Sequence, residues 1–282
     1  MPRFDTPAPV SLTLHVAVGT TRIAASGLPE STVAVHPGDP DREADVKAAD
    51  QTRVSYADGR LLVATPKGRG LFSRPGSVSV EITLPEGSEV HGTASMGDFT
   101  CTGRLGDCRL KSSAGDILVA RADAVHAVTQ YGDVAVEYAA GSAQLTTASG
   151  ALRAGELGGS AELKNSNGTT RVDEARGELR LKVANGDISI GRAHASVTAR
   201  SANGAIRIAE AVRGALELDT SAGDLQVGVR EGTAVWLDAD SKAGQVRSSL
   251  ESVGGPGEAA ETLAVRARTS LGDIDIFRAG RD

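Results

Sequence analysis

The chain has 282 residues, of which 34 are glycine, four phenylalanine, three tyrosine and one tryptophan. So few large aromatic side chains argue against an ordinary compact core and favour thin, repeated layers of Ala, Val, Leu and Ile. The net charge of -6 argues against general nucleic-acid binding, which requires a basic surface.

The N-terminal stretch "MPRFDTPAPVSLTL" has no basic segment that leads into an apolar one, so it does not have the pattern of a signal peptide. The sequence also has no apolar run of about 18 residues, the length that a membrane-spanning helix needs. The two cysteines are too few for a disulfide scaffold. We therefore expect a cytoplasmic protein with no membrane insertion.

Residues 1–95 alternate apolar and polar side chains without a fixed repeat length. Examples are "SLTLHVAV" at 11–18 and "SVSVEITLP" at 77–85. Alternation with period two is typical of strands that bury one face. We predict that 1–95 is a β-rich region that caps the repeats after it, because the end of a strand stack leaves backbone groups unpaired.

From 96 to 277 a glycine recurs about every 18 residues. The series consists of Gly97, Gly115, Gly132, Gly150, Gly168, Gly186, Gly204, Gly223, Gly244 and Gly272. A weaker series of small residues lies halfway between: Gly106, Ala124, Gly141, Gly159, Gly177, Ala195, Gly214 and Gly232. The repeat of 18 residues therefore consists of two half-repeats of about nine residues each.

Each half-repeat has glycine, a variable residue, and then an apolar, an outward and an apolar residue, as in "GDISI" at 186–190. Such a short strand cannot bury its apolar face alone, but successive copies bury it when they stack. Glycine every nine residues also excludes helices. The sequence predicts an all-β fold, a parallel β-solenoid of about 18 residues per coil over 96–277. Ile188 and Ile190 should face its core.

Asparagine precedes the repeat glycine in three successive coils, at Asn167, Asn185 and Asn203. Stacking in register predicts that these side chains form a structural ladder joined by amide hydrogen bonds.

The segment 248–262, "SSLESVGGPGEAAET", departs from the repeat. Its glycines, proline and glutamates predict an acidic, flexible loop. "LAVRARTSLGDIDIF" at 263–277 then returns to the pattern as the last coil.

Tandem units of the form [SA]-x-G-D-[IVL]-x-[IVL], after a β-region that ends in "VEITLPEGSEV" (80–90), carry a family resemblance. The chain resembles the bacterial "putative adhesin" family of β-strand-repeat proteins, a domain of unknown function, and looks most like its actinobacterial members. The resemblance covers about 10–277 and implies a β-solenoid. It supplies no catalytic residues.

Catalytic, metal and cofactor sites are not indicated by the sequence. Aspartate follows several repeat glycines, but the "GGxGxD" pattern of calcium-binding rolls does not occur. The five histidines lack metal-ligand spacing, and the outward columns show no carboxylate pair beside an aromatic sugar platform. We expect no cofactor.

Arg153, Arg171 and Arg207 occupy one outward column of the predicted coils. Stacked guanidinium groups could bind an anionic partner, and a solvated charged face is the alternative. We predict a non-enzymatic scaffold or protein-interaction module that contacts a protein partner or itself. A surface adhesin is an alternative, and a carbohydrate-active β-helix enzyme is a disfavoured one.

Overall fold

The computed structural model describes residues 2–66, 75–250 and 261–280. The chain forms two compact units, Met1–Ala140 and Gly141–Asp282, called here the N-terminal and the C-terminal unit. The expected loop at 248–262 falls mostly outside the described residues. The predicted boundary at residue 95 stays a prediction.

The N-terminal unit contains nine strands and the helix α1 among its described residues. Their bounds are β1 (Arg3–Asp5), β2 (Ser11–Ser26), β3 (Glu30–Pro37), α1 (Glu43–Asp50), β4 (Arg53–Ala57), β5 (Arg60–Ala64), β6 (Val78–Pro85), β7 (Glu89–Ala114), β8 (Ile117–Tyr131) and β9 (Val134–Ala139). Antiparallel pairs join β1 to β3, β3 to β6 and β4 to β5. The strands β2, β7, β8 and β9 pair in parallel, as a solenoid requires.

The coil register begins earlier than the periodic glycines indicate. Strand β2 pairs in parallel with β7, and Gly19 lies opposite Gly97. Gly19 has a φ of 140°, like the repeat glycines that follow. The sequence pattern missed this coil because the antiparallel strands and α1 separate β2 from β7 along the chain.

The C-terminal unit is built from strands alone among its described residues. Their bounds are β10 (Ala143–Ser149), β11 (Leu152–Leu157), β12 (Ala161–Asn167), β13 (Thr170–Ala175), β14 (Leu179–Asn185), β15 (Ile188–Ala193), β16 (Val197–Asn203), β17 (Ile206–Ala211), β18 (Gly214–Ala222), β19 (Leu225–Val229), β20 (Thr233–Ala243), β21 (Val246–Ser248), β22 (Glu261–Leu271) and β23 (Ile274–Arg278).

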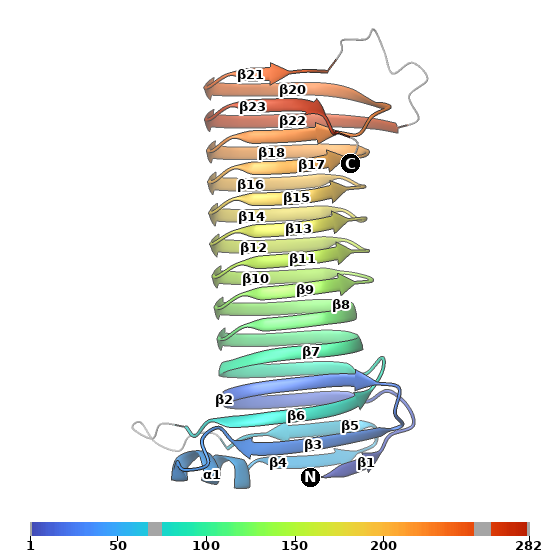
Figure 1. Cartoon of the computed structure of the whole chain (residues 1–282), viewed down its shortest axis with the longest axis vertical. Coiled ribbons are helices and arrows are strands. Elements are labelled where there is room, and N and C mark those ends of the chain that lie inside the picture. Colours follow the sequence, from blue (N-terminus) through green and yellow to red (C-terminus); the bar gives the residue numbers. More distant parts are fainter. Residues whose placement is uncertain (1, 67–74, 251–260, 281–282) are drawn as a thin grey trace. The chain divides into compact units, whose positions relative to one another are not determined.

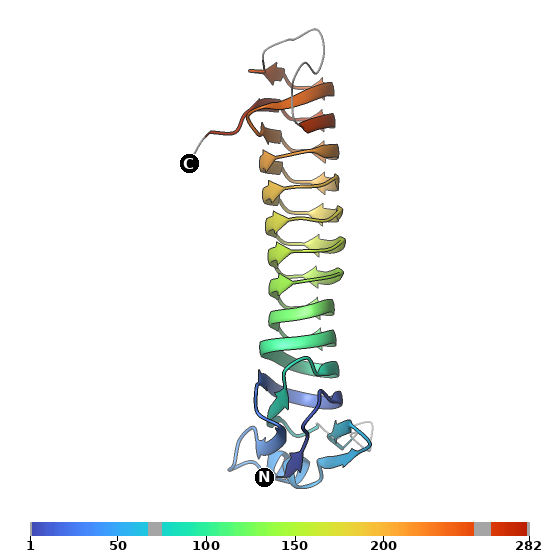
Figure 2. The same ribbon diagram turned by 90° about the vertical axis from the view of Figure 1, so that its right-hand side faces the viewer.

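These strands form two facing parallel layers (Figures 1 and 2). Strands β10, β12, β14, β16 and β18 pair in one layer, and β11, β13, β15, β17 and β19 pair in the other. Leu179 lies opposite Val197, and Ile188 lies opposite Ile206, each 18 residues further along the chain. The predicted parallel β-solenoid with coils of about 18 residues is confirmed.

The last coils do not stack in chain order. Strand β22 lies between β18 and β20, and β23 lies between β19 and β21. The glycine contacts agree, because a Cβ on Gly272 would meet the Gly223 carbonyl and one on Gly244 would meet the Gly272 carbonyl. The final coil of the sequence is thus inserted, and β20 and β21 form the outermost coil of the unit (Figure 1).

The interior of the coils is mostly apolar, and most of its polar side chains lie in one column beside the corners. Ile188 and Ile190 are buried, as the alternation predicted. At several corners an inward polar side chain donates a hydrogen bond to a repeat-glycine carbonyl, whereas Val183 occupies this position in one coil and Ser201 Oγ has no partner in the next. The hydrogen-bonded pairs include Ser112 with Gly97, Thr129 with Gly115, Asn165 with Gly150, Thr220 with Gly204, Thr269 with Gly223 and Ser241 with Gly272. The column therefore ties neighbouring coils together where glycine leaves space.

Candidate functional site

The three asparagines that precede repeat glycines lie side by side. Asn203 donates from Nδ2 to Asn185 Oδ1, and Asn185 donates to Asn167 Oδ1, both at 2.9 Å. Asn167 in turn donates to the Ala148 carbonyl at 3.3 Å. All three amides point along the stack and spend their hydrogen bonds on neighbouring coils, which suits a structural role.

The outward arginines lie in one column, but not as an unbroken cationic strip. Arg153 lies opposite Arg171, while Ser189 separates Arg171 from Arg207. Arg171 donates to Asp173 at 2.8 Å, and Arg207 donates to Gln226 at 2.8 Å. A carboxylate therefore already offsets part of the positive charge, and anion binding at this column stays a prediction.

The aspartates that follow repeat glycines accept hydrogen bonds from the next coil. Asp98 Oδ1 accepts from the Asp116 N–H at 2.9 Å, and Asp187 Oδ1 accepts from the Ala205 N–H at 2.8 Å. Their carboxylates are thus used at the corners. Within the described ranges, no group of three or more His, Cys, Asp or Glu side chains converges as metal ligands would.

The two cysteines form a buried pair within β7. Cys101 and Cys108 are both free. A hydrogen bond between Cys108 and Cys101, together with burial, raises the pKa of the Cys108 thiol well above its usual range, with nearby Asp107 adding to the effect. Because the thiolate is the reactive form, this site does not favour thiol chemistry.

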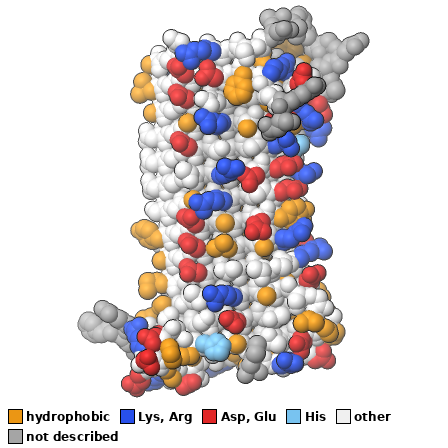
Figure 3. Space-filling model, viewed as in Figure 1, with side chains coloured by type: hydrophobic (Ala, Val, Ile, Leu, Met, Phe, Trp, Pro, Cys, Tyr) orange, Lys and Arg blue, Asp and Glu red, His pale blue; other side chains and the backbone are white. Residues whose placement is uncertain are grey.

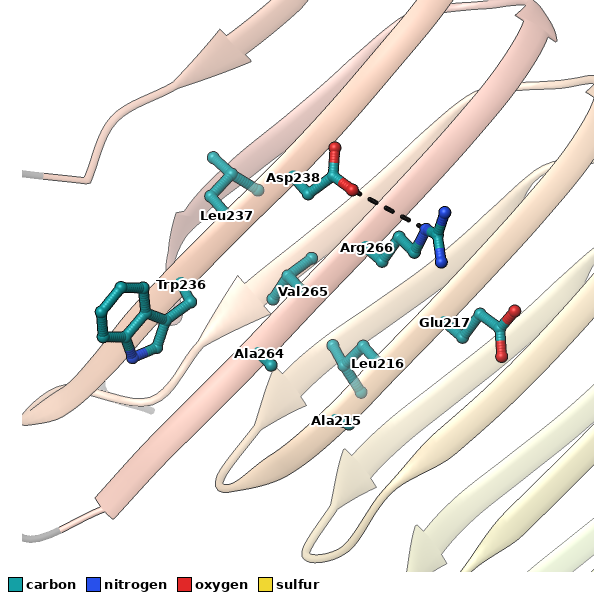
Figure 4. Close-up of a pocket in the computed structure, with 9 residues that line it drawn as sticks. All are labelled: Ala215, Leu216, Glu217, Trp236, Leu237, Asp238, Ala264, Val265 and Arg266. Carbon is teal, nitrogen blue, oxygen red and sulfur yellow. Dashed lines mark ion pairs between the residues drawn. The ribbon is translucent and has the colours of Figure 1, made fainter.

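A shallow hollow on the outer face of the C-terminal unit is a candidate site, because the exposed Trp236 lines it (Figure 4). Its volume is about 480 Å³. Ala215 and Ala264 lie opposite each other at its floor, and Trp236 stands next to Ala264 on β20. The small alanine side chains leave the indole without a neighbour on that side, and 65% of Trp236 is exposed.

Charged side chains border the hollow on the side away from Trp236. Arg266 Nε lies 3.7 Å from Asp238 Oδ2, and Glu217 lies next to Arg266 in register (Figure 4). Glu217 is also 3.0 Å from Arg200, and Asp238 is 3.0 Å from Arg268. Positive and negative side chains are interspersed at this rim, as they are on much of the face drawn in Figure 3. The site joins an exposed apolar platform to a polar edge.

Sequence reasoning did not single out this hollow. Trp236 is visible as the chain's one tryptophan, at an outward position of an alternating stretch. However, both alanines lie on one side of it, and its other side is free, only because β22 is inserted between β18 and β20. The repeat spacing alone places β20 directly on β18, which would set Trp236 between Ala215 and Ala264 and leave no hollow beside it.

The repeat region matches a known protein family over its whole length. The family model described as Toastrack DUF4097 matches residues 43–277. The chain belongs to the Toastrack DUF4097 family. This agrees with the β-solenoid and with the resemblance seen in the repeat units. The family is a domain of unknown function, so membership assigns no process.

Several solved structures resemble this Toastrack chain. A "putative adhesin" from Parabacteroides merdae is 12% identical, with a TM-score of 0.49, and the match covers 80% of this chain and 94% of that one. A "putative adhesin" from Bacteroides fragilis is 15% identical, with a TM-score of 0.36, and covers 98% and 95%. At these identities the likeness concerns fold alone. A search of curated proteins returned no match.

The cytoplasmic location expected from the sequence is wrong by these comparisons. The matching structures are described as adhesins, and one from Clostridium sporogenes as a "putative cell adhesion protein", descriptions typical of surface-exposed proteins. The expectation rested on the N-terminal composition and the cysteine count, neither of which is a property of the folded repeat. In the part of the chain that the structure describes, no helix has the length and apolar character to cross a membrane.

Proposed function

We propose that this Toastrack chain is a non-catalytic protein-interaction module, and that the hollow beside Trp236 receives an apolar side chain of a partner protein. The observation that carries the proposal is the exposed indole over a floor of two alanines, with charged groups at one edge. Tryptophan and arginine dominate binding energy at protein interfaces, usually within a polar rim.

The shape of the hollow favours a protein over a small molecule. Small-molecule sites are concave and bury most of their ligand. Here the outer faces of the strands form an open floor. The Trp236 side chain borders it on one side and the charged side chains border it on the other (Figure 4). Such a surface excludes water only when a second surface of similar size covers it.

The proposal is also consistent with how the repeat uses its polar groups. The asparagine and aspartate columns and the interior hydroxyls bind neighbouring coils. His194 Nε2 contacts Glu174 at 3.0 Å, but Glu174 also pairs with Arg176 at 3.2 Å. That contact therefore belongs to a surface ion-pair cluster, the arrangement expected of a solvated edge.

Removing the indole tests the proposal. We expect Trp236→Ala to leave the melting temperature unchanged, because the side chain is mostly exposed, and to weaken partner binding at least tenfold. The measurement is quantitative co-purification from the native cell, followed by affinity measurement on the recovered partner. Tyr131→Ala is the matched control, because Tyr131 is equally exposed, at 65%, on the N-terminal unit.

A photo-crosslinking amino acid at position 264 gives an independent readout. It should capture the same partner that Trp236→Ala loses. If Trp236→Ala and Tyr131→Ala bind the partner equally, or if position 264 captures nothing, the hollow is not the binding site.

A further inference from the structure

The outermost coil of the C-terminal unit ends in unpaired strand edges. Among the described strands, β20 pairs only with β22, and β21 pairs only with β23. Inward positions of this coil are uncovered as a result: Leu237 is 41% and Val246 is 45% exposed. A free parallel edge with open apolar positions is a template for another strand.

The backbone direction shows which residues offer hydrogen bonds at the edge of β20. The Gly272 N–H donates to the Ala243 carbonyl, so the polar groups of Ala243 face β22. The N–H and C=O groups of successive residues alternate between the two sides of a strand. Those of Asp240 and Lys242 therefore point to the free edge.

The side chains along this edge carry unused charges. Asp240 and Lys242 both lie at outward positions, and neither forms an ion pair with another described residue. Asp238, in contrast, is already paired with Arg266 and Arg268. One free anion and one free cation therefore stand two residues apart on the exposed strand.

We propose that a second copy of this chain occupies the edge, with β20 pairing antiparallel to β20 of the second copy about a two-fold axis perpendicular to the sheet. In the register centred on Ser241, Asp240 of each copy lies opposite Lys242 of the other. The two-fold axis forms this ion pair twice and makes both residues hydrogen-bonded partners. The register centred on Asp240 brings two aspartates together, so like-charge repulsion disfavours it.

This pairing also explains the exposed apolar side chains. In the register centred on Ser241, Leu237 of each copy lies near the corner of the other copy at which β21 begins, beside Val246. Both residues are inward-facing in their own coil and become covered by the opposing coil. A second copy thus completes the end of the solenoid.

The dimer would arrange the hollows for bivalent binding, a consequence that rests on the proposed function. A two-fold axis perpendicular to the sheet leaves both Trp236 hollows on the same face. A partner array that engages both gains avidity without any new contact. The dimer itself does not depend on the hollow, so either proposal can fail alone.

Charge exchange at the edge is the first test. Sedimentation velocity of the full chain should show a dimer, and Asp240→Lys and Lys242→Asp should each weaken it at least about tenfold, because each replaces two attractive pairs by two repulsive ones. The double variant Asp240→Lys/Lys242→Asp restores opposite charges and should recover the dimer. Unchanged thermal melting of all three variants shows that they are folded.

Disulfide trapping fixes the register. Ser241 lies on the proposed axis opposite its own copy, as a non-hydrogen-bonded pair with Cα atoms about 4.5 Å apart, within disulfide reach. Ser241→Cys should therefore cross-link between copies on mild oxidation, whereas Ala239→Cys, which faces position 243, should not. A wild-type chain that stays monomeric at about 0.1 mM overturns the proposal. A double variant that does not recover the dimer also overturns it. So does cross-linking at 239 in preference to 241.

Discussion

Replacing Ile188 with aspartate is expected to unfold the C-terminal unit. Ile188, on β15, is 1% exposed and faces the interior of the solenoid, where the neighbouring strands place Thr170 and Ile206 beside it. An aspartate there buries an unpaired charge in a core only two layers thick, at a cost of more than about 4 kcal/mol. Chemical denaturation followed by circular dichroism should show the loss as a missing or strongly shifted transition.

Ser189→Asp is the matched control, one residue further along the same strand. Ser189 points outward and lies between Arg171 and Arg207 in register. A carboxylate at that position adds an exposed charge beside two guanidinium groups, and we expect stability within about 0.5 kcal/mol of wild type. Equal melting of Ile188→Asp and wild type would show that residue 188 does not face the core.

Gly186→Ala is expected to destabilise the C-terminal unit by about 3 kcal/mol or more. Gly186 has a φ of 140°, a conformation that L side chains rarely adopt. An added Cβ would also collide with the Gly168 carbonyl in the coil beneath, and backbone cannot move aside as a side chain can. Urea denaturation of the purified variant measures the effect.

Gly232→Ala separates the two causes. Gly232 also has a positive φ, of 81°, but no atom lies within 4 Å of an added Cβ. Its cost should be about 1 kcal/mol, that of backbone strain alone. If both alanine variants lost equal stability, the close approach of neighbouring corners would not be what requires glycine in the repeat.

The repeat could be predicted from sequence because one residue type marks each corner. Gly168, Gly186 and Gly204 have positive φ angles, and each would collide with the glycine one coil away if it carried a side chain. Because no other residue fits at these corners, glycine recurs in the sequence every 18 residues. The alternation between them, as at Ile188 and Ile190, records the buried face.

The order of the last coils and the hollow could not be predicted in this way. Periodicity shows that β20 and β22 both have the shape of a coil, but both fit equally well on β18. The two orders differ in the charges that meet β18: β22 places Arg266 beside Glu217 and Arg268 beside Asp219, whereas β20 there would place Asp238 and Asp240 beside these two carboxylates. The candidate site inherits this ambiguity, because only the observed order leaves one side of Trp236 free; chain order would set it between Ala215 and Ala264.

The most direct measurement of the central claim is a pair of spin-label distances along one outward column. The column runs from Glu162 through Arg180, Thr198, Glu217 and Arg266 to Asp238, one coil per step. Labels are placed at 162 with 266, and at 162 with 238, in a chain without native cysteines and diluted with unlabelled protein.

Stacking in register with the inserted coil predicts about 19 Å for the first pair and about 24 Å for the second, since each step adds about 4.8 Å. A shorter distance from 162 to 238 than from 162 to 266 would contradict the inserted coil. Distances that do not grow by equal steps along the column would contradict the stacked repeat itself.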